Sequence, residues 1–250
     1  MGLTHEEAHR LAREKGINPV AYFVARLVLV PLLRILFGLR ATGVEHIPER
    51  GAVVIAPNHK SFWDSFFLAA VVRRRLHFMG KAELFTGWRG RLFLMLGAFP
   101  VRRGSSDDEA IETARAILHR GDVLALFPEG TRVSDPARLG HPKRGATRLA
   151  IETGAVIVPA AMTGTEKRKW PLPRKVRIVF GEPIPVTDLT PGPEHAGLLL
   201  DQTVWPTVSE EYQKLRNTPG LVAAGLAALG LGLGYAVHRR RRGRHHHYHN

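Results

Sequence analysis

Residues 52–64 have the sequence AVVIAPNHKSFWD, which indicates the fold class of the chain. Its first five residues form an uninterrupted apolar run, which is typical of a short strand buried on both faces of a sheet. The polar residues that follow lead into a segment that begins at Asp64 and predicts a helix over 64–75. A buried strand that passes through a polar loop into a helix is the repeating unit of a parallel α/β sheet.

The same alternation continues along the chain. The sequence therefore predicts an α/β fold, a strand–helix alternating domain with a mostly parallel central sheet. Ser106, Asp107, Asp108 and Glu109 form a candidate capping box at the start of one helix. The further expected strands cover 123–127, 155–160 and 176–180, the further helices cover 83–96, 106–120 and 145–153, and a connector at 191–193 precedes a last helix.

The N-terminal region predicts two helices and no signal peptide. A capping box over Thr4–Glu7 opens the first helix, and Asn18 caps a second, mostly apolar helix over 20–39 that Pro31 is expected to kink. Arg26 and Arg34 lie eight residues apart and share one face. This pattern favours an interfacial membrane helix with its arginines on lipid head groups. The alternative is an amphipathic helix packed on a soluble domain.

The C-terminal region joins an uncharged stretch, Leu221–Val237, to a run of five arginines between 239 and 244. Seventeen residues are the lower limit for a membrane span. We expect a shallow or re-entrant membrane segment, or a segment packed on the N-terminal helix, with the arginines on anionic lipids. His245–His247 and His249 carry no assigned function. The predicted organisation is N-terminal helices over 1–40, a catalytic domain over 41–218, and an apolar helix with a basic tail over 219–250.

Composition narrows the classes of function. The 250 residues contain no cysteine, which excludes disulfides, Cys-ligated zinc and a thiol nucleophile. The net charge is +14, and about +9 remains without the arginine run, so an anionic partner is expected. A membrane surface or an anionic substrate suits this charge better than nucleic acid, because aromatic residues are not interleaved with the basic run.

His59 and Asp64 form the first motif, directly after the strand at 52–56. A carboxylate five residues beyond a histidine can hold its Nδ1–H and leave Nε2 free to accept a hydroxyl proton. The alternative is a histidine that caps the helix beside a solvated aspartate.

Two more motifs follow other apolar strands. Arg102 and Arg103 suit bidentate recognition of a phosphate, with a solvated basic loop as the alternative. In the hexapeptide Phe127–Arg132, Gly130 permits a tight turn, Glu129 can accept from a hydroxyl, and Arg132 adds a cation. A plain strand-to-loop turn is the alternative there.

Together these motifs resemble the glycerophospholipid acyltransferase family, specifically its bacterial 1-acylglycerol-3-phosphate acyltransferases. The blocks of that family appear in order between about residues 55 and 185. One departure is Val133, which stands where the family usually has serine. The matching residues are Asn58, His59, Ser61 and Asp64 in the first block, Gly97, Arg102 and Arg103 in the second, Phe127 to Arg132 in the third, and Val156 to Pro159 in the fourth, with Lys143 and Gly145 matching a basic segment between.

The resemblance implies transfer of an acyl group from a thioester of coenzyme A or acyl carrier protein to the hydroxyl of a lysophospholipid. It implies His59 as general base with Asp64 as its partner, and it implies neither a metal nor a cofactor beyond the acyl thioester. The implied location is the cell membrane, on the cytoplasmic side. Alternatives are another acceptor, such as glycerol 3-phosphate, or a non-catalytic basic adaptor. The expected substrate-binding residues are Arg102, Arg103, Glu129, Gly130, Thr131, Arg132 and Lys143.

Overall fold

The computed structural model describes residues 3–102, 107–166 and 175–217. Seven strands form one sheet in the order β1-β7-β6-β2-β5-β3-β4, and every neighbouring pair is parallel except β6 with β7. The predicted α/β fold with a mostly parallel sheet is confirmed. The strands are β1 Arg40–Thr42, β2 Val53–Pro57, β3 Leu76–Lys81, β4 Ala98–Val101, β5 Val123–Ala125, β6 Val156–Thr163 and β7 Arg177–Phe180.

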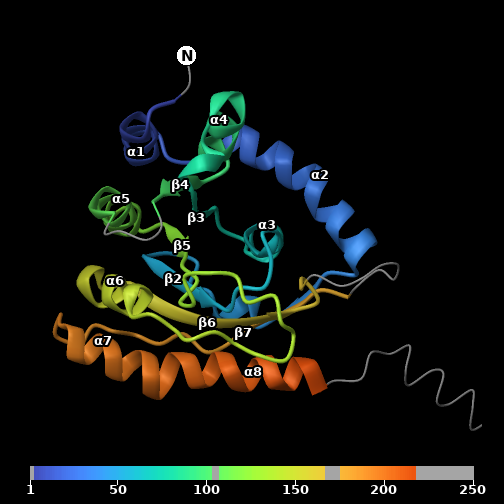
Figure 1. Cartoon of the computed structure of the whole chain (residues 1–250), viewed down its shortest axis with the longest axis vertical. Helices are drawn as coiled ribbons and strands as arrows, with labels where there is room; N and C mark the ends of the chain where they lie inside the picture. The colour runs from blue at the N-terminus through green and yellow to red at the C-terminus, as the bar shows by residue number, and fades with distance from the viewer. Residues whose placement is uncertain (1–2, 103–106, 167–174, 218–250) are drawn as a thin grey trace, which may run out of the picture. The chain divides into compact units, whose positions relative to one another are not determined.

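Helices cover both faces of this sheet, with α5 and α6 on one side and α3 on the other (Figure 1). A π-helical segment, Leu200–Val204, joins α7 to α8. Short 3₁₀ turns lie at Val44–His46 and Ala82–Leu84. The helices are α1 His5–Glu14, α2 Pro19–Phe37, α3 Asp64–Val71, α4 Gly87–Met95, α5 Asp108–His119, α6 Gly145–Thr153, α7 Pro193–Leu199 and α8 Trp205–Asn217.

The central strand is β2, and all its residues are buried. Val54 lies between Leu124 of β5 and Ile157 of β6, so apolar side chains surround it along the sheet. An apolar run is stable in this position because helices cover both faces of the sheet. The strand ends at Pro57, and the first polar motif therefore starts at the carboxyl edge of the sheet.

Several predicted boundaries were wrong. The helix predicted over 64–75 ends at Val71, since the backbone turns extended at Val72. Arg74 then donates to the carbonyls of Pro48, Gly51 and Gly121. The chain next enters β3, and neither this strand nor β1 was predicted. The helix predicted over 83–96 divides into the turn Ala82–Leu84 and α4.

The start of α5 and the end of β6 also differ from prediction. Asp107 caps α5 by accepting from the N–H of Ala110 at 3.2 Å, while Ser106 lies outside the described residues. β6 does not end near Pro159 but continues to Thr163, because its second half pairs with β7.

The N-terminal caps agree with prediction. The hydroxyl of Thr4 accepts from the N–H of Glu7 at 3.1 Å, and the carboxylate of Glu7 accepts from the N–H of Thr4 at 3.0 Å. Asn18 accepts from the N–H of Ala21 and caps α2. These bonds satisfy N–H groups that have no partner within the helix.

Arg26 does not point to lipid head groups as predicted. Its guanidinium donates to the carbonyls of Ala69, Ala70 and Val72 at the carboxyl end of α3. A cation is favourable there because the last carbonyls of a helix carry partial negative charge. Arg26 thus ties α2 to the helix that begins at Asp64, whereas Arg34 remains exposed.

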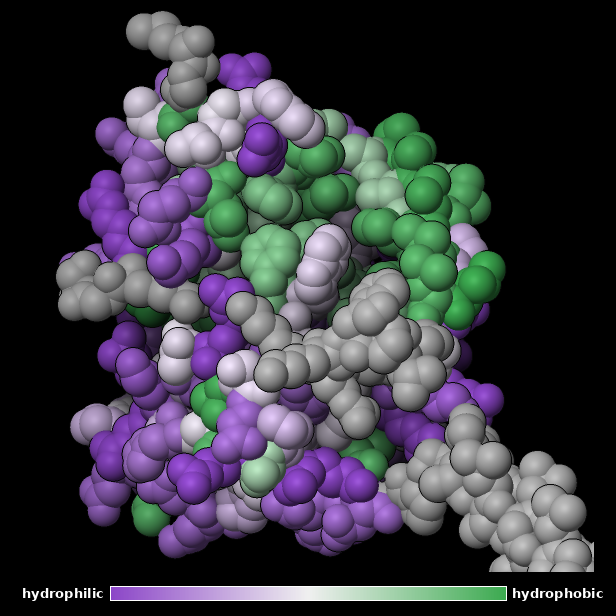
Figure 2. Space-filling view, turned by 45° about the vertical axis from the view of Figure 1, so that its right-hand side comes forward, coloured by the Kyte–Doolittle hydropathy of each residue, from purple (hydrophilic) through white to green (hydrophobic). Residues whose placement is uncertain are grey.

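α2 exposes an apolar surface, which lies at the upper right of Figure 2. By length and composition it is the one described helix that could cross a membrane, and its most apolar window is 11% buried. Leu27 is 64% exposed and Ile35 is 79% exposed. This surface indicates association with a membrane.

The contacts divide the chain into a compact unit, Met1–Leu215, and a second unit, Arg216–Asn250. α1 and α2 therefore belong to the same unit as the sheet. The predicted C-terminal membrane segment, Leu221–Val237, and the arginine run lie outside the described residues.

Candidate active site

His59 and Asp64 meet at the carboxyl end of β2. The Nδ1 of His59 lies 2.8 Å from Oδ2 of Asp64, and both side chains are buried. An ionised carboxylate only accepts hydrogen bonds, so Nδ1 carries the proton and Nε2 keeps its lone pair. The pair thus has the geometry of a general base with an orienting partner.

Asp64 is the first residue of α3 and is held by the loop before it. Its Oδ2 also accepts from the backbone N–H of Lys60 at 2.6 Å and of Ser61 at 2.8 Å. These bonds stabilise the carboxylate at the start of a helix, where negative charge is favourable. Within the described residues, Oδ1 of Asp64 is buried and has no hydrogen-bond partner. Because Oδ2 accepts three hydrogen bonds, the carboxylate can move little without breaking one of them.

Asn58 extends the contact between β2 and β6 beyond the end of β2. Its Nδ2 donates to the carbonyl of Met162 at 3.1 Å, and its Oδ1 accepts from the N–H of Met162 at 2.8 Å. The amide side chain thus takes the place of a backbone partner. These bonds hold β6 near Met162, where it also pairs with β7, and they fix the residue immediately before His59.

Glu129 holds the backbone of His59. Its Oε2 accepts from the N–H of His59 at 2.6 Å, and its Oε1 accepts from the N–H of Gly140 at 2.6 Å. Burial raises the pKa of Glu129, and the two N–H donors offset part of this effect. The side chain is 2% exposed and both oxygens are engaged, so the structure gives it partners other than the acceptor hydroxyl that the sequence suggested.

Two further contacts restrict the histidine. The ring of Phe127 stacks on that of His59, with 4.0 Å between ring centroids. The backbone N–H of Val133 donates to the carbonyl of His59 at 2.8 Å. Since the residue at 133 acts here through its backbone, the departure from the family pattern leaves this contact intact.

Lys60 holds the loop that follows the third motif. Its buried ammonium donates to the carbonyls of Asp135, at 2.9 Å, and of Arg138. It also lies 4.7 Å from the ring centroid of Tyr212, whose hydroxyl donates to the carbonyl of Pro136. Lys60 was not among the predicted site residues, because its partners lie more than 70 residues away in the sequence.

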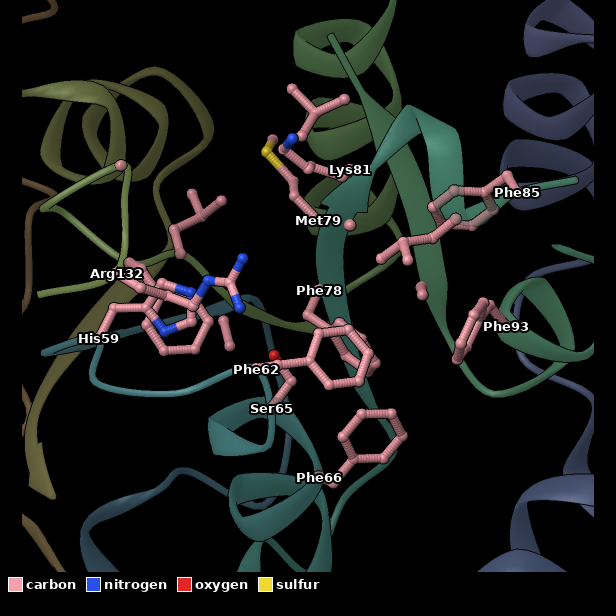
Figure 3. A pocket seen from close by; sticks show the side chains of 18 residues that line it. His59, Phe62, Ser65, Phe66, Phe78, Met79, Lys81, Phe85, Phe93 and Arg132 are labelled. Atoms are coloured by element: carbon pink, nitrogen blue, oxygen red, sulfur yellow. The ribbon is translucent and has the colours of Figure 1, made fainter. Parts of the chain in front are cut away.

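An apolar cavity of about 270 Å³ opens beside His59. Figure 3 shows His59 and Arg132 at one side of it and Phe85 and Phe93 at the opposite side. Its mostly apolar lining suits a hydrocarbon chain. Other lining side chains come from the loop before α3, from α3 itself, and from β3, β4 and β5, including Phe62, Ser65, Phe66, Phe78, Met79 and Val101.

The predicted basic residues occupy different places. Arg132 is exposed and lines the cavity together with Gly130. Lys143 is exposed, and its side chain runs along Gly130, where an added Cβ would lie 3.4 Å from Cδ of Lys143. Gly130 has a φ of +64°, a conformation that other residues rarely adopt.

The remaining predicted residues are Arg102, Arg103 and Thr131. Arg102 follows β4 and is exposed, and its N–H donates to Asp107. Thr131 is exposed beside Gly130, whereas Arg103 lies outside the described residues. The structure thus brings Arg132 to the histidine and shows Arg102 at the same edge of the sheet.

The residues that β3 contributes to the cavity were not predicted. Lys81, at the end of this strand, is exposed and lines the cavity, as do Met79 and Gly80. The apolar residues of 76–79 were the signal that could have revealed the strand. The strand was not predicted because the three arginines before it were included in the predicted helix.

Comparisons with known proteins indicate the family of the chain. A family model described as "Acyltransferase" matches residues 38–163. The 1-acyl-sn-glycerol-3-phosphate acyltransferase of Bacillus subtilis is 32% identical over 154 residues, which cover 60% of this chain and 76% of that protein. The human 1-acyl-sn-glycerol-3-phosphate acyltransferase alpha is 29% identical over 190 residues, covering 71% of this chain and 66% of that protein.

A solved structure shares the fold. It is the 1-acyl-sn-glycerophosphate acyltransferase PlsC of Thermotoga maritima, with a TM-score of 0.60 and 24% sequence identity. The match covers 79% of this chain and 84% of that one. At this identity the likeness concerns the fold alone. Because the family model matches about half of the chain and the Bacillus protein is matched over 76% of its length, this chain belongs to the acyltransferase family.

Proposed function

We propose that this enzyme transfers a fatty acyl group from a thioester of coenzyme A or acyl carrier protein to the free hydroxyl of 1-acylglycerol 3-phosphate. The product is phosphatidic acid. The observation that carries the proposal is His59, which Asp64 orients at 2.8 Å and which lines an apolar cavity. The names of the Bacillus and human relatives give the same reaction class.

The reaction needs one proton acceptor near the thioester. Nε2 of His59 takes the proton of the acceptor hydroxyl as its oxygen attacks the thioester carbonyl carbon. Asp64 stabilises the imidazolium that results. The tetrahedral intermediate then collapses, the carbon–sulfur bond breaks, and the imidazolium returns its proton to the leaving thiolate. No covalent enzyme intermediate is needed, because a thioester is already activated.

We assign the cavity and the cations around it to different groups of the substrates. The apolar part, bounded by Phe85 and Phe93, takes the hydrocarbon chain of the acyl donor. Arg132, together with Lys143 and Arg102, binds the phosphate of the acceptor, since guanidinium groups match phosphate oxygens. Arg103 belongs to this proposed set on its sequence position. Gly130 and Thr131 form the turn that presents Arg132.

Glu129 is proposed as a positioning residue. It fixes the backbone of His59 and that of Gly140 through its two carboxylate oxygens. A shift of the histidine by about 1 Å would cost on the order of 10²-fold in rate. Its place in the third motif therefore follows from holding the base and not from contact with the acceptor.

The acceptor is a membrane lipid, so the enzyme works at a bilayer. The exposed apolar face of α2 is the proposed attachment surface, with Trp88 of α4 also exposed. We propose that the catalytic domain lies on the cytoplasmic side of the cell membrane, where acyl thioesters are made available. The chain has a net charge of +14, so it would attract anionic lipids. The same charge would attract acyl carrier protein where that protein is the acyl donor.

A panel of acceptors tests this assignment. Purified, detergent-solubilised protein is assayed with acyl-coenzyme A or acyl carrier protein thioester and with 1-acylglycerol 3-phosphate, glycerol 3-phosphate or a lyso-glycolipid. We expect the highest kcat/KM with 1-acylglycerol 3-phosphate. A higher value with glycerol 3-phosphate or with the uncharged lipid would contradict the proposed acceptor.

Arg132→Ala should raise the KM for the phosphorylated acceptor more than that for the donor.

A further inference from the structure

Two histidines of α1 face a carboxylate of α5, away from the proposed active site. His5 and His9 are one helical turn apart, and Glu109 lies in the first turn of α5. One ligand atom from each of the three lies within 4.8 Å of the other two. Residues four apart share a helix face, so His5 and His9 present their rings to the same point. The substrate cavity has neither histidine among its lining residues.

The distances suit a metal ion. Nε2 of His5 lies 3.2 Å from Nε2 of His9. Two imidazole nitrogens that bind one tetrahedral zinc ion, each at about 2.0–2.1 Å, are separated by about 3.3–3.4 Å. The same two nitrogens could instead share one proton in a hydrogen bond, and then Glu109 would serve only its ion pair with Arg13, at 3.4 Å. The two arrangements differ in whether a metal binds.

The second nitrogen of His9 already has a partner. Nδ1 of His9 lies 2.9 Å from the hydroxyl of Thr113, which also accepts from the guanidinium of Arg13 at 3.0 Å. His9 and Thr113 are fully buried. In metal sites the ligating histidine commonly donates its other N–H to such a partner, which fixes the ring and the tautomer. Thr113 can take this role, and Nε2 of His9 then directs its lone pair at His5.

We propose that His5, His9 and Glu109 bind one Zn²⁺ ion, which links α1 to α5. Two imidazoles and one carboxylate suit Zn²⁺ better than Mg²⁺ or Ca²⁺, which prefer oxygen ligands. A water molecule or Asp107 completes four-coordination, since Oδ2 of Asp107 lies 3.6 Å from Nε2 of His5. The inference does not depend on the proposed acyl transfer.

The residues between the histidines indicate a structural role. His5-Glu6-Glu7-Ala8-His9 has the His-Glu-x-x-His pattern of zinc peptidases, in which the first glutamate acts as a base. Here Glu6 is exposed and Glu7 serves the capping box with Thr4. His9 is completely buried, so a substrate has no access to it. α1 packs on α5 and β4, and the ion would hold it in this position.

The first experiment measures metal binding by the full-length chain. The tail histidines His245, His246, His247 and His249 are replaced by alanine, because they would bind metal themselves. This tail variant is freed of metal, dialysed against Zn²⁺ and analysed for bound metal. We expect one Zn²⁺ per chain, the strong visible absorption of four-coordinate Co²⁺ after exchange, and a higher Tm with Zn²⁺ than with a chelator. A tail variant that binds no Zn²⁺ would overturn the proposal.

The second experiment assigns the ligands. In the tail variant, His5→Asn and Glu109→Gln should each lower Zn²⁺ affinity by at least about tenfold and remove the Zn²⁺-dependent rise in Tm. Glu6→Gln, next to His5 and exposed, is the matched control and should leave both unchanged. Both ligand positions are partly exposed, which limits their effect on folding. Unchanged Zn²⁺ affinity in both ligand variants would also overturn the proposal.

Discussion

The two ends of the substrate cavity are built in different ways. At the polar end, His59 is fixed through its ring, its N–H and its carbonyl, by Asp64, Glu129 and Val133. At the apolar end, Phe85 and Phe93 contribute only shape, with their ring centroids 6.1 Å apart. Directed bonds set positions to fractions of an ångström, whereas packing sets volume. Changes at the polar end should therefore alter the rate, and changes at the apolar end should alter the choice of substrate.

Asp64→Asn should have the largest effect of the variants that compare the two ends. The neutral amide no longer stabilises the imidazolium that forms on His59, although its oxygen can still accept from Nδ1–H. Its NH₂ group then takes the place of Oδ1, which is buried without a hydrogen-bond partner among the described residues. We expect kcat to fall by about 10²–10⁴-fold. Steady-state kinetics of the purified variant measure this effect, and circular dichroism checks the fold. A kcat within a few-fold of wild type in folded protein would contradict the role of Asp64.

Glu129→Gln should have the next largest effect. The glutamine amide can accept from only one of the two N–H donors, His59 and Gly140, through its oxygen, and its NH₂ group opposes the other. A buried unsatisfied donor costs about 1–3 kcal/mol, and displacement of the base lowers kcat by about 10–10²-fold. Glu112→Gln, at an exposed position, is the control.

The kinetic pattern of Glu129→Gln separates two roles. A positioning residue changes kcat and leaves the KM of the acceptor near its wild-type value. An unchanged kcat with a raised acceptor KM would instead support the contact with glycerol that the sequence suggested.

Phe85→Ala tests the apolar end. Phe85 is buried and lines the cavity, so the smaller side chain lengthens the space for a hydrocarbon chain. We expect the ratio of kcat/KM for longer against shorter acyl donors to rise about tenfold, a size typical of hydrophobic pockets. The measurement uses a series of acyl thioesters. Phe23→Ala, on the exposed face of α2, should leave the ratio unchanged.

Leu27→Ser on α2 should have the smallest effect on turnover in detergent. Its side chain is mostly exposed, so the free energy of unfolding should change by less than about 0.5 kcal/mol. Binding to vesicles that contain anionic lipid should weaken several-fold, because apolar surface no longer enters the bilayer. Sedimentation with vesicles measures this binding, with the exposed Glu49→Ser as control. Equal binding by both variants would remove α2 from the proposed attachment surface.

The sequence predicted the elements whose signals are local. The apolar run of β2 and the caps at Thr4 and Asn18 depend on neighbouring residues, and the structure confirms them. β3 was missed because His77 and Gly80 interrupt its apolar residues and three arginines precede it. Local patterns do not contain the information for contacts between distant segments.

The same distinction applies to the site. The five-residue spacing of His59 and Asp64 predicted a contact that the structure shows. The bond between Glu129 and the backbone of His59 joins residues 70 positions apart and could not be read from a motif. The cavity, likewise, combines side chains from several strands and helices, and it exists only once the sheet is assembled.

Turnover by His59→Ala protein shows whether His59 is the catalytic base. The purified variant is assayed with saturating acyl thioester and 1-acylglycerol 3-phosphate, after circular dichroism and thermal unfolding have shown a native fold. With the base removed, we predict that kcat falls by at least about 10³-fold, while both substrates still bind. A folded His59→Ala protein that turns over at a near-normal rate would mean that His59 is not the base.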